Sequence, residues 1–167
     1  LGSEVFRAMY LRDWSWDRIR DELARDIAYV RSRGKGSGIV LGDASRGDLD
    51  QLIELTNFWI DAGADRLFIA DSFGSLSPQG TTYLISKIRR GMKAPIPIVY
   101  HAHDDLGLGT ANALAAAAAG AWSEASINGI GERAFAKLEE YIMALELLYG
   151  VDTGIKLERL TELSRTV

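Results

Sequence analysis

Short apolar segments alternate with helix-forming segments along this chain, and four such cycles follow one another at intervals of about 28 residues. From their length and β-branched content, we predict buried strands over residues 38–42, 66–70, 95–100 and 123–128. Apolar spacing of three and four residues, or alanine-rich sequence, predicts helices over residues 14–33, 48–62, 78–90, 111–121, 138–150 and 156–167. Alternation of this kind is typical of an α/β fold with a parallel sheet.

Polar, glycine-rich sequence follows each predicted strand. The four stretches are GDASRGD (42–48), DSFGSLSP (71–78), HAHDDLG (101–107) and NGIGER (128–133). In parallel α/β sheets and barrels, ligands bind beyond the carboxyl ends of the strands. We therefore expect these stretches to meet at one end of the sheet and to form one candidate site.

The composition excludes several classes of function. The chain has 19 basic and 23 acidic residues and no run of basic residues, so we expect neither a nucleic acid nor a membrane as partner. The absence of cysteine excludes disulfides, thiolate zinc sites and a cysteine nucleophile. The chain has no dinucleotide or Walker motif and no apolar run long enough for a membrane span. We expect a soluble, cytoplasmic protein with one compact domain.

Both histidines of the chain, His101 and His103, end the third predicted strand. Alternate residues of a strand point to the same side about 7 Å apart, so the two imidazoles can bind one metal ion. Asp104 and Asp105 follow directly, and they can ligate the ion, orient the histidines or cap the next helix. In the alternative without a metal, one histidine is a core residue and the other a loop residue.

The first two polar stretches also allow two interpretations. Asp71 can act as a base or ligand, and Ser72 can donate a hydrogen bond to a substrate carboxylate, or both residues can hold a turn. Asp43 and Arg46 can serve a site or form a salt bridge. Asp48 is a predicted helix cap.

The fourth stretch supplies the amide of Asn128 and the charged pair Glu132 and Arg133. A guanidinium group suits a carboxylate or phosphate, which predicts substrate contacts for Arg133, with Asn128 as a second candidate. The alternative for Arg133 is an ordinary salt bridge.

HAHDDLG, SINGIGERA, LEEYIMAL and DTGI together resemble the HMGL-like superfamily of α-isopropylmalate synthase, homocitrate synthase and HMG-CoA lyase. SEVFR, DASRGD and ADSFGSLSP match further segments in the right order, so the resemblance covers nearly the whole chain. These enzymes are metal-dependent (β/α)8 TIM barrels that make or break carbon–carbon bonds next to a carbonyl. The synthase branch is closer around the histidines, and DSFGSLSP is also similar to the aldolase branch.

The resemblance implies an activity and residue roles. His101 and His103 would hold a divalent metal ion (Mn, Mg, Zn or Co) that binds a 2-oxo acid, and Ser72 would contact the substrate carboxylate. Glu132 would belong to the active-site wall, and we predict catalytic roles for Glu132 and Asp71. In the synthases, acetyl-CoA is the co-substrate whose methyl carbon attacks the 2-oxo acid. An aldolase or lyase and a non-catalytic relative are the alternatives, and we expect a homodimer.

Three departures from the family pattern accompany the resemblance. The aspartate ligand and arginine of the family's first strand have no counterpart before residue 37, so residues 1–167 match strands 5–8, the C-terminal half of a barrel, as one domain. GERAFAKLEE lacks the asparagine ligand of the usual GERAGN, and Gly42 replaces a glutamate. We expect these residues to be part of a longer protein and inactive alone, or else to pair with a second half such as another copy.

Overall fold

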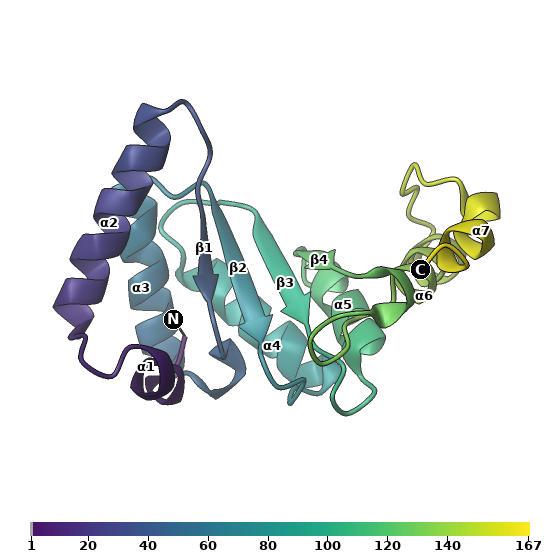
Figure 1. Ribbon diagram of the computed structural model, residues 1–167, viewed down its shortest axis with the longest axis horizontal. Coiled ribbons are helices and arrows are strands. Elements are labelled where there is room, and N and C mark those ends of the chain that lie inside the picture. The colour runs from purple at the N-terminus through teal and green to yellow at the C-terminus, as the bar shows by residue number, and fades with distance from the viewer. Residues whose placement is uncertain (1) are drawn as a thin grey trace.

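The computed structural model describes residues 2–167. These residues contain one sheet of four strands, together with the helices that connect them. Its strands are β1 (Gly38–Leu41), β2 (Arg66–Asp71), β3 (Ile98–Ala102) and β4 (Trp122–Glu124). They lie side by side in chain order, and every neighbouring pair is parallel, as the arrows of Figure 1 show. The predicted α/β fold with a parallel sheet is confirmed.

The helices follow the predicted pattern with two exceptions. The predicted ones are α2 (Trp16–Ser32), α3 (Leu49–Ala62), α4 (Pro78–Gly91), α5 (Gly109–Ala118) and α6 (Leu138–Tyr149). A further helix, α1 (Glu4–Tyr10), was not predicted, because one turn or two is too short to display a period. The last predicted helix is divided into a 3₁₀ turn (Leu157–Arg159) and α7 (Leu160–Ser164).

The third and fourth strands differ from their predicted bounds by more than one residue. The third strand begins at Ile98 rather than at residue 95, because Pro95 and Pro97 have no N–H to donate to a ladder. At its other end the strand extends to Ala102, two residues beyond the prediction, and includes His101. The fourth strand ends at Glu124, and residues Ile127–Gly129 form a 3₁₀ turn instead of the predicted strand end.

Serine and aspartate side chains cap α2, α3 and α4. Asp48 accepts a hydrogen bond from the Gln51 N–H, as predicted, and begins α3. Ser77 accepts one from the Gly80 N–H at 3.1 Å and begins α4, with Pro78 in the first turn. These caps satisfy N–H groups that a helix start leaves without a partner.

The Ser77 cap can be tested directly. We expect Ser77→Ala to lower the free energy of unfolding by about 1 kcal/mol, because it removes the acceptor for the Gly80 N–H. Ser77→Asp is the matched control, since aspartate caps equally well. Urea denaturation measures both variants, and equal losses in the two would contradict the assigned cap.

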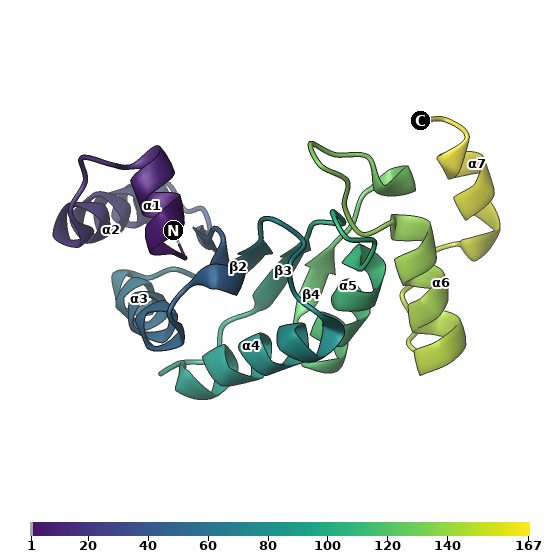
Figure 2. The same cartoon turned by 90° about the horizontal axis from the view of Figure 1, so that it is seen from below.

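Helices cover only one face of the sheet. Figure 2 shows α3, α4 and α5 along the outer side of the curved sheet, with α1 and α2 at one end and α6 and α7 at the other. The strand residues that face these helices, including Leu41, Ile69 and Tyr100, are completely buried and form the core with the helices. Strand alternation sends their neighbours to the opposite face.

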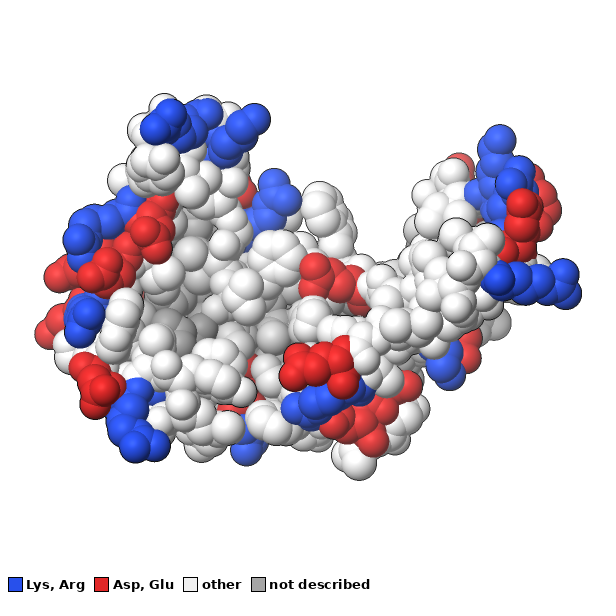
Figure 3. Space-filling view, viewed as in Figure 1, with Lys and Arg blue, Asp and Glu red and all other residues white. Residues whose placement is uncertain are grey.

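The opposite face is open and apolar. It includes Val40 on β1 and Trp122 on β4, whose exposed fractions are 53% and 65%. Figure 3 shows few charges over the strands, whereas charged side chains gather over α2, over α7 and along the lower edge. Parallel sheets are normally covered on both faces, so this open face is a feature of part of a barrel. No helix within residues 2–167 has the length and apolarity needed to cross a membrane.

Candidate functional site

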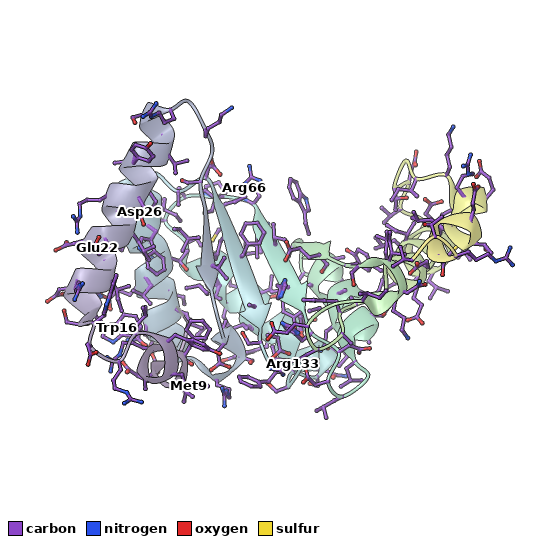
Figure 4. All side chains as sticks on the ribbon, viewed as in Figure 1. Met9, Trp16, Glu22, Asp26, Arg66 and Arg133 are labelled. Carbon is purple, nitrogen blue, oxygen red and sulfur yellow. The ribbon has the colours of Figure 1, made fainter. Side chains whose placement is uncertain are left out.

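The four polar stretches follow β1 to β4 and lie at the carboxyl ends of the strands, as predicted. Two pockets lie at this end, and they adjoin because Phe6, Ser72 and His103 line both. In Figure 4, Met9 from α1 and Arg133 from the stretch after β4 lie at this end of the sheet. Both residues line the first pocket.

His101 and His103 converge within this site. Their ring centroids are 4.9 Å apart, with an angle of 75° between the ring planes, and both residues line the second pocket. Glu124 on β4 is the direct register partner of His101 on β3. Its Oε2 lies 2.6 Å from Nδ1 of His101, which leaves Nε2 of that ring available to a ligand.

His103 is held in the form that binds metals. Only 8% of the residue is exposed, and its buried Nδ1 has no hydrogen-bond partner among residues 2–167. Burial lowers the pKa of His103, and its electrostatic interactions with His101 and Arg133 lower it further. The neutral imidazole that results is the form that a metal ligand requires.

The histidine pair fits a divalent ion as two of its ligands. Two convergent imidazoles, one of them oriented by a carboxylate, are a common arrangement in metal sites. The part of the chain that the structure describes contains no group of three or more His, Cys, Asp or Glu side chains able to hold a metal. The pair therefore accounts for two ligands, and it leaves the others to water, to substrate or to groups outside residues 2–167.

Ser72, Glu132 and Arg133 lie at the first pocket, together with His103. Ser72 Oγ accepts a hydrogen bond from the Asp43 N–H at 2.8 Å and keeps its own proton for another acceptor. Arg133 forms a salt bridge with Asp105, with nitrogen–oxygen distances of 2.6 and 3.0 Å. This contact is the salt-bridge alternative of the prediction.

Asp71 lies outside both pockets. Strand alternation turns Ser72 to the open face and Asp71 to the helix side, where only 1% of Asp71 is exposed. Its carboxylate accepts hydrogen bonds from the N–H groups of Ser75 and Leu76, at 3.1 and 2.9 Å. The geometry therefore gives Asp71 a part in holding the loop and no contact with the candidate site.

Asn128 also lies outside both pockets. Its Nδ2 donates to the Ser164 carbonyl at 2.8 Å, and the Ser164 hydroxyl donates to its Oδ1. The amide thus joins the stretch after β4 to α7, and the structure does not bring it to the histidines.

The two aspartates after the histidines have separate partners. Asp104 accepts from the Gly109 N–H at 2.6 Å, at the start of α5, which is the capping alternative. Asp105 pairs with Arg133. Both carboxylates are therefore engaged with groups of the protein.

The loop after β1 anchors α1 over the pockets. Asp43 is fully buried, and its carboxylate accepts from Ser3 Oγ at 2.5 Å and from two nitrogens of Arg46 at 2.8 and 2.9 Å. The guanidinium groups of Arg46 and Arg133 lie 4.3 and 4.4 Å from the ring centroid of Phe73. These contacts fix the walls of the first pocket.

The sequence model of the HMGL-like family matches residues 2–167. The chain belongs to the HMGL-like family. Three curated relatives are a putative (R)-citramalate synthase of Methanopyrus kandleri, a 2-isopropylmalate synthase of Methanocaldococcus jannaschii and a homocitrate synthase of Methanothermobacter thermautotrophicus. Their identities to this chain are 44%, 40% and 42%, over 87%, 92% and 84% of its length. The aligned part is 29%, 30% and 36% of each relative, so the chain spans about a third of their length.

Two solved structures share the fold of this chain. An HMG-CoA lyase of Acinetobacter baumannii, solved with coenzyme A and 3-methylmalate, covers 99% of this chain with a TM-score of 0.82 and 20% identity. An HMG-CoA lyase of Bacillus subtilis covers 99% with a TM-score of 0.86 and 19% identity. This chain covers 57% and 59% of those two chains. The likeness shows the fold, which is part of a (β/α)8 TIM barrel, as predicted.

Two residues of this HMGL-like site were missed by the sequence analysis. Glu124 is an unremarkable acidic residue in a strand, and only the β3–β4 register places it beside His101. Phe135 lies against both imidazoles, with ring centroids 4.6 Å from His101 and 4.5 Å from His103. The departure from GERAGN marked the position of Phe135 but gave no sign of these contacts.

Proposed function

We propose that the complete protein is a metal-dependent acyltransferase that condenses acetyl-CoA with a 2-oxo acid. The observation that carries this proposal is the convergence of His101 and His103 at the carboxyl end of β3. It is supported by 40–44% identity to relatives that are named as synthases of citramalate, isopropylmalate and homocitrate. Residues 1–167 would be the C-terminal half of the catalytic barrel.

In this proposal His101 and His103 hold a divalent ion of the Mn, Mg, Zn or Co type. When bound, such an ion acts as a Lewis acid toward the 2-oxo acid carbonyl. Glu124 orients His101 by accepting the proton of Nδ1, so that the Nε2 lone pair is directed away from Glu124. Burial keeps His103 neutral and therefore able to ligate.

Polar groups around the pair would bind the rest of the substrate. Ser72 lies in both pockets and has a free hydroxyl proton to donate to the substrate carboxylate. Glu132 lines the first pocket and is the candidate acid–base residue of this chain. The positive charge of Arg133 would help to keep the nearby His103 neutral. Alternatively, Arg133 would release Asp105 and bind the substrate carboxylate. We do not assign Asp71 or Asn128 to the reaction, because their side chains are bonded elsewhere.

The Ser72 role gives a testable prediction. Ser72→Ala should raise the KM for the 2-oxo acid by about 10- to 100-fold, because a hydrogen bond to a charged group contributes roughly 1.5–3 kcal/mol. Ser72→Thr is the matched control, since threonine keeps the hydroxyl group and should keep the KM within a few-fold. Steady-state kinetics with varied 2-oxo acid measure both, and equal KM values for the Ala and Thr variants would remove Ser72 from the substrate site.

Two other functions are alternatives for the same site. A lyase would use the same residues to cleave a carbon–carbon bond of the kind that a synthase forms, in a hydroxy acid or in its thioester. A non-catalytic relative is favoured by the lack of a third metal ligand within residues 2–167 and by the contact of Phe135 with both imidazoles. The assay below separates the three.

The complete gene product should be incubated with acetyl-CoA, Mn²⁺ and a panel of 2-oxo acids, and release of the free CoA thiol should be followed. We expect release with at least one acid, and none from the 167-residue chain tested in parallel. Cleavage of a hydroxy acid without thiol release would support a lyase. Neither reaction in the complete protein would support a non-catalytic relative, and turnover by the 167-residue chain alone would contradict the view of this chain as half of a site.

A further inference from the structure

Phe135 is packed against the two candidate metal ligands at once. Its ring lies 4.5 Å from the His103 ring at a tilt of 33°, and 4.6 Å from the His101 ring at 72°. It lines neither of the two pockets, although both imidazoles do. The histidine pair therefore has a pocket on one side and an aromatic ring on another.

The backbone holds Phe135 firmly in this place. Its N–H donates to the Gly129 carbonyl at 3.1 Å, and the residue forms an antiparallel bridge with His103. On either side of it, the Asp104 N–H donates to the Ala134 carbonyl at 3.2 Å and the Ala136 N–H to Ala102 at 3.0 Å. The stretch after β4 is thus tied to the end of β3.

The backbone beside this ring has two special features. Ala134 has a φ of +61°, in the left-handed region that costs a residue with a Cβ roughly 1 kcal/mol. Gly131 has no side chain, and a Cβ there would overlap the Phe135 ring. The absence of a side chain at Gly131 therefore leaves the space that the Phe135 ring occupies.

An aromatic ring at this place changes what the histidine pair can bind. It supplies no lone pair, and it keeps water from the side of the imidazoles that it covers. Mg²⁺ and Mn²⁺ prefer six mainly oxygen ligands, whereas Zn²⁺ is satisfied by four ligands that include imidazole. The side of the pair that packs against Phe135 thus offers an ion no ligand, and the pocket side would supply the remaining ones.

We propose that Phe135 is a specificity-determining residue that restricts the histidine pair to ions of low coordination number, zinc before manganese or magnesium. This inference rests on the proposed metal site and goes beyond it, because it assigns the choice of ion to one residue. Removal of the ring should admit further oxygen ligands and favour the harder ions.

The test is the affinity of the complete protein for Zn²⁺ and for Mn²⁺, measured by calorimetry and, for Mn²⁺, by the fall of the free-ion electron paramagnetic resonance signal. Phe135→Asn supplies an amide oxygen, and Phe135→Ala opens space for water. We expect both to strengthen Mn²⁺ binding by about 10-fold or more relative to Zn²⁺, within the range known for residues around a metal's ligands. Phe135→Leu is the matched control, because it keeps an apolar side chain, and it should retain the wild-type preference.

The outcomes separate this inference from the proposed function. Unchanged relative affinity for the two ions in both the Asn and the Ala variant would overturn the role of Phe135. The proposed metal site would still be supported in that case if replacing both histidines abolished metal binding. If the wild type binds neither ion, or binds Mn²⁺ more tightly than Zn²⁺, the inference is overturned. Circular dichroism identifies a variant that does not fold. If either the Asn or the Ala variant fails to fold, the relative affinity of the other one gives the result.

Discussion

Replacing His101 and His103 together by alanine is expected to weaken divalent-ion binding by the complete protein at least about 100-fold, because it would remove both imidazoles of the proposed metal site. Metal content after dialysis, measured by plasma mass spectrometry, gives the result. These are the only two histidines of the chain, so no other residue of this type can replace them.

A graded variant tests the same site. Glu124→Gln keeps both ligands but weakens the carboxylate contact to Nδ1 of His101, and it should cost about 10- to 100-fold in metal affinity. Asp13→Ala, an exposed position between α1 and α2, is the control and should leave the affinity unchanged. Full metal content in the double histidine variant would reject the assigned site.

Replacing Asp71 by alanine is expected to lower the free energy of unfolding by about 3–5 kcal/mol. The substitution leaves the N–H groups of Ser75 and Leu76 without the fully buried carboxylate that accepts from them, and a backbone group that loses its partner costs roughly 1–3 kcal/mol where it is shielded from water. The Tyr100 hydroxyl, 3.4 Å from Asp71 Oδ2, loses a contact as well. Chemical denaturation followed by circular dichroism measures the change.

Two comparisons make the Asp71 result decisive. Asp71→Asn retains one acceptor oxygen and should lose clearly less stability, whereas Asp13→Ala should stay within about 0.5 kcal/mol of the wild type. A folded, stable Asp71→Ala protein that has lost its turnover would contradict the structural role and would restore Asp71 as a catalytic candidate.

The sequence was sufficient for the order of the elements and for the location of the site. Short apolar runs, helical spacing and alanine-rich sequence depend on nearby residues alone, so they identified the four strands and the five longer helices. The placement of polar stretches after every strand then located the site, because parallel strands end at one edge of a sheet. The pairing of His101 with His103 is equally local, since alternate residues of one extended segment share a face.

The same patterns could not separate residues that share a stretch but face opposite ways. Asp71 and Ser72 are adjacent, and a one-residue difference in the strand end decides which of them faces the pockets. Asn128 is similar, because its partner Ser164 lies 36 positions further along the chain. A pattern of nearby residues carries no information on such a contact.

By itself, the sequence determined the alternating fold, the HMGL-like resemblance, the strand-end site and the histidine pair. Only the tertiary structure decided what surrounds that pair: Glu124 from the neighbouring strand and Phe135 from the stretch after β4. The physical reason is that strand register and the packing of distant segments are set by the whole core, whereas periodicity records only which way each residue points from its own element.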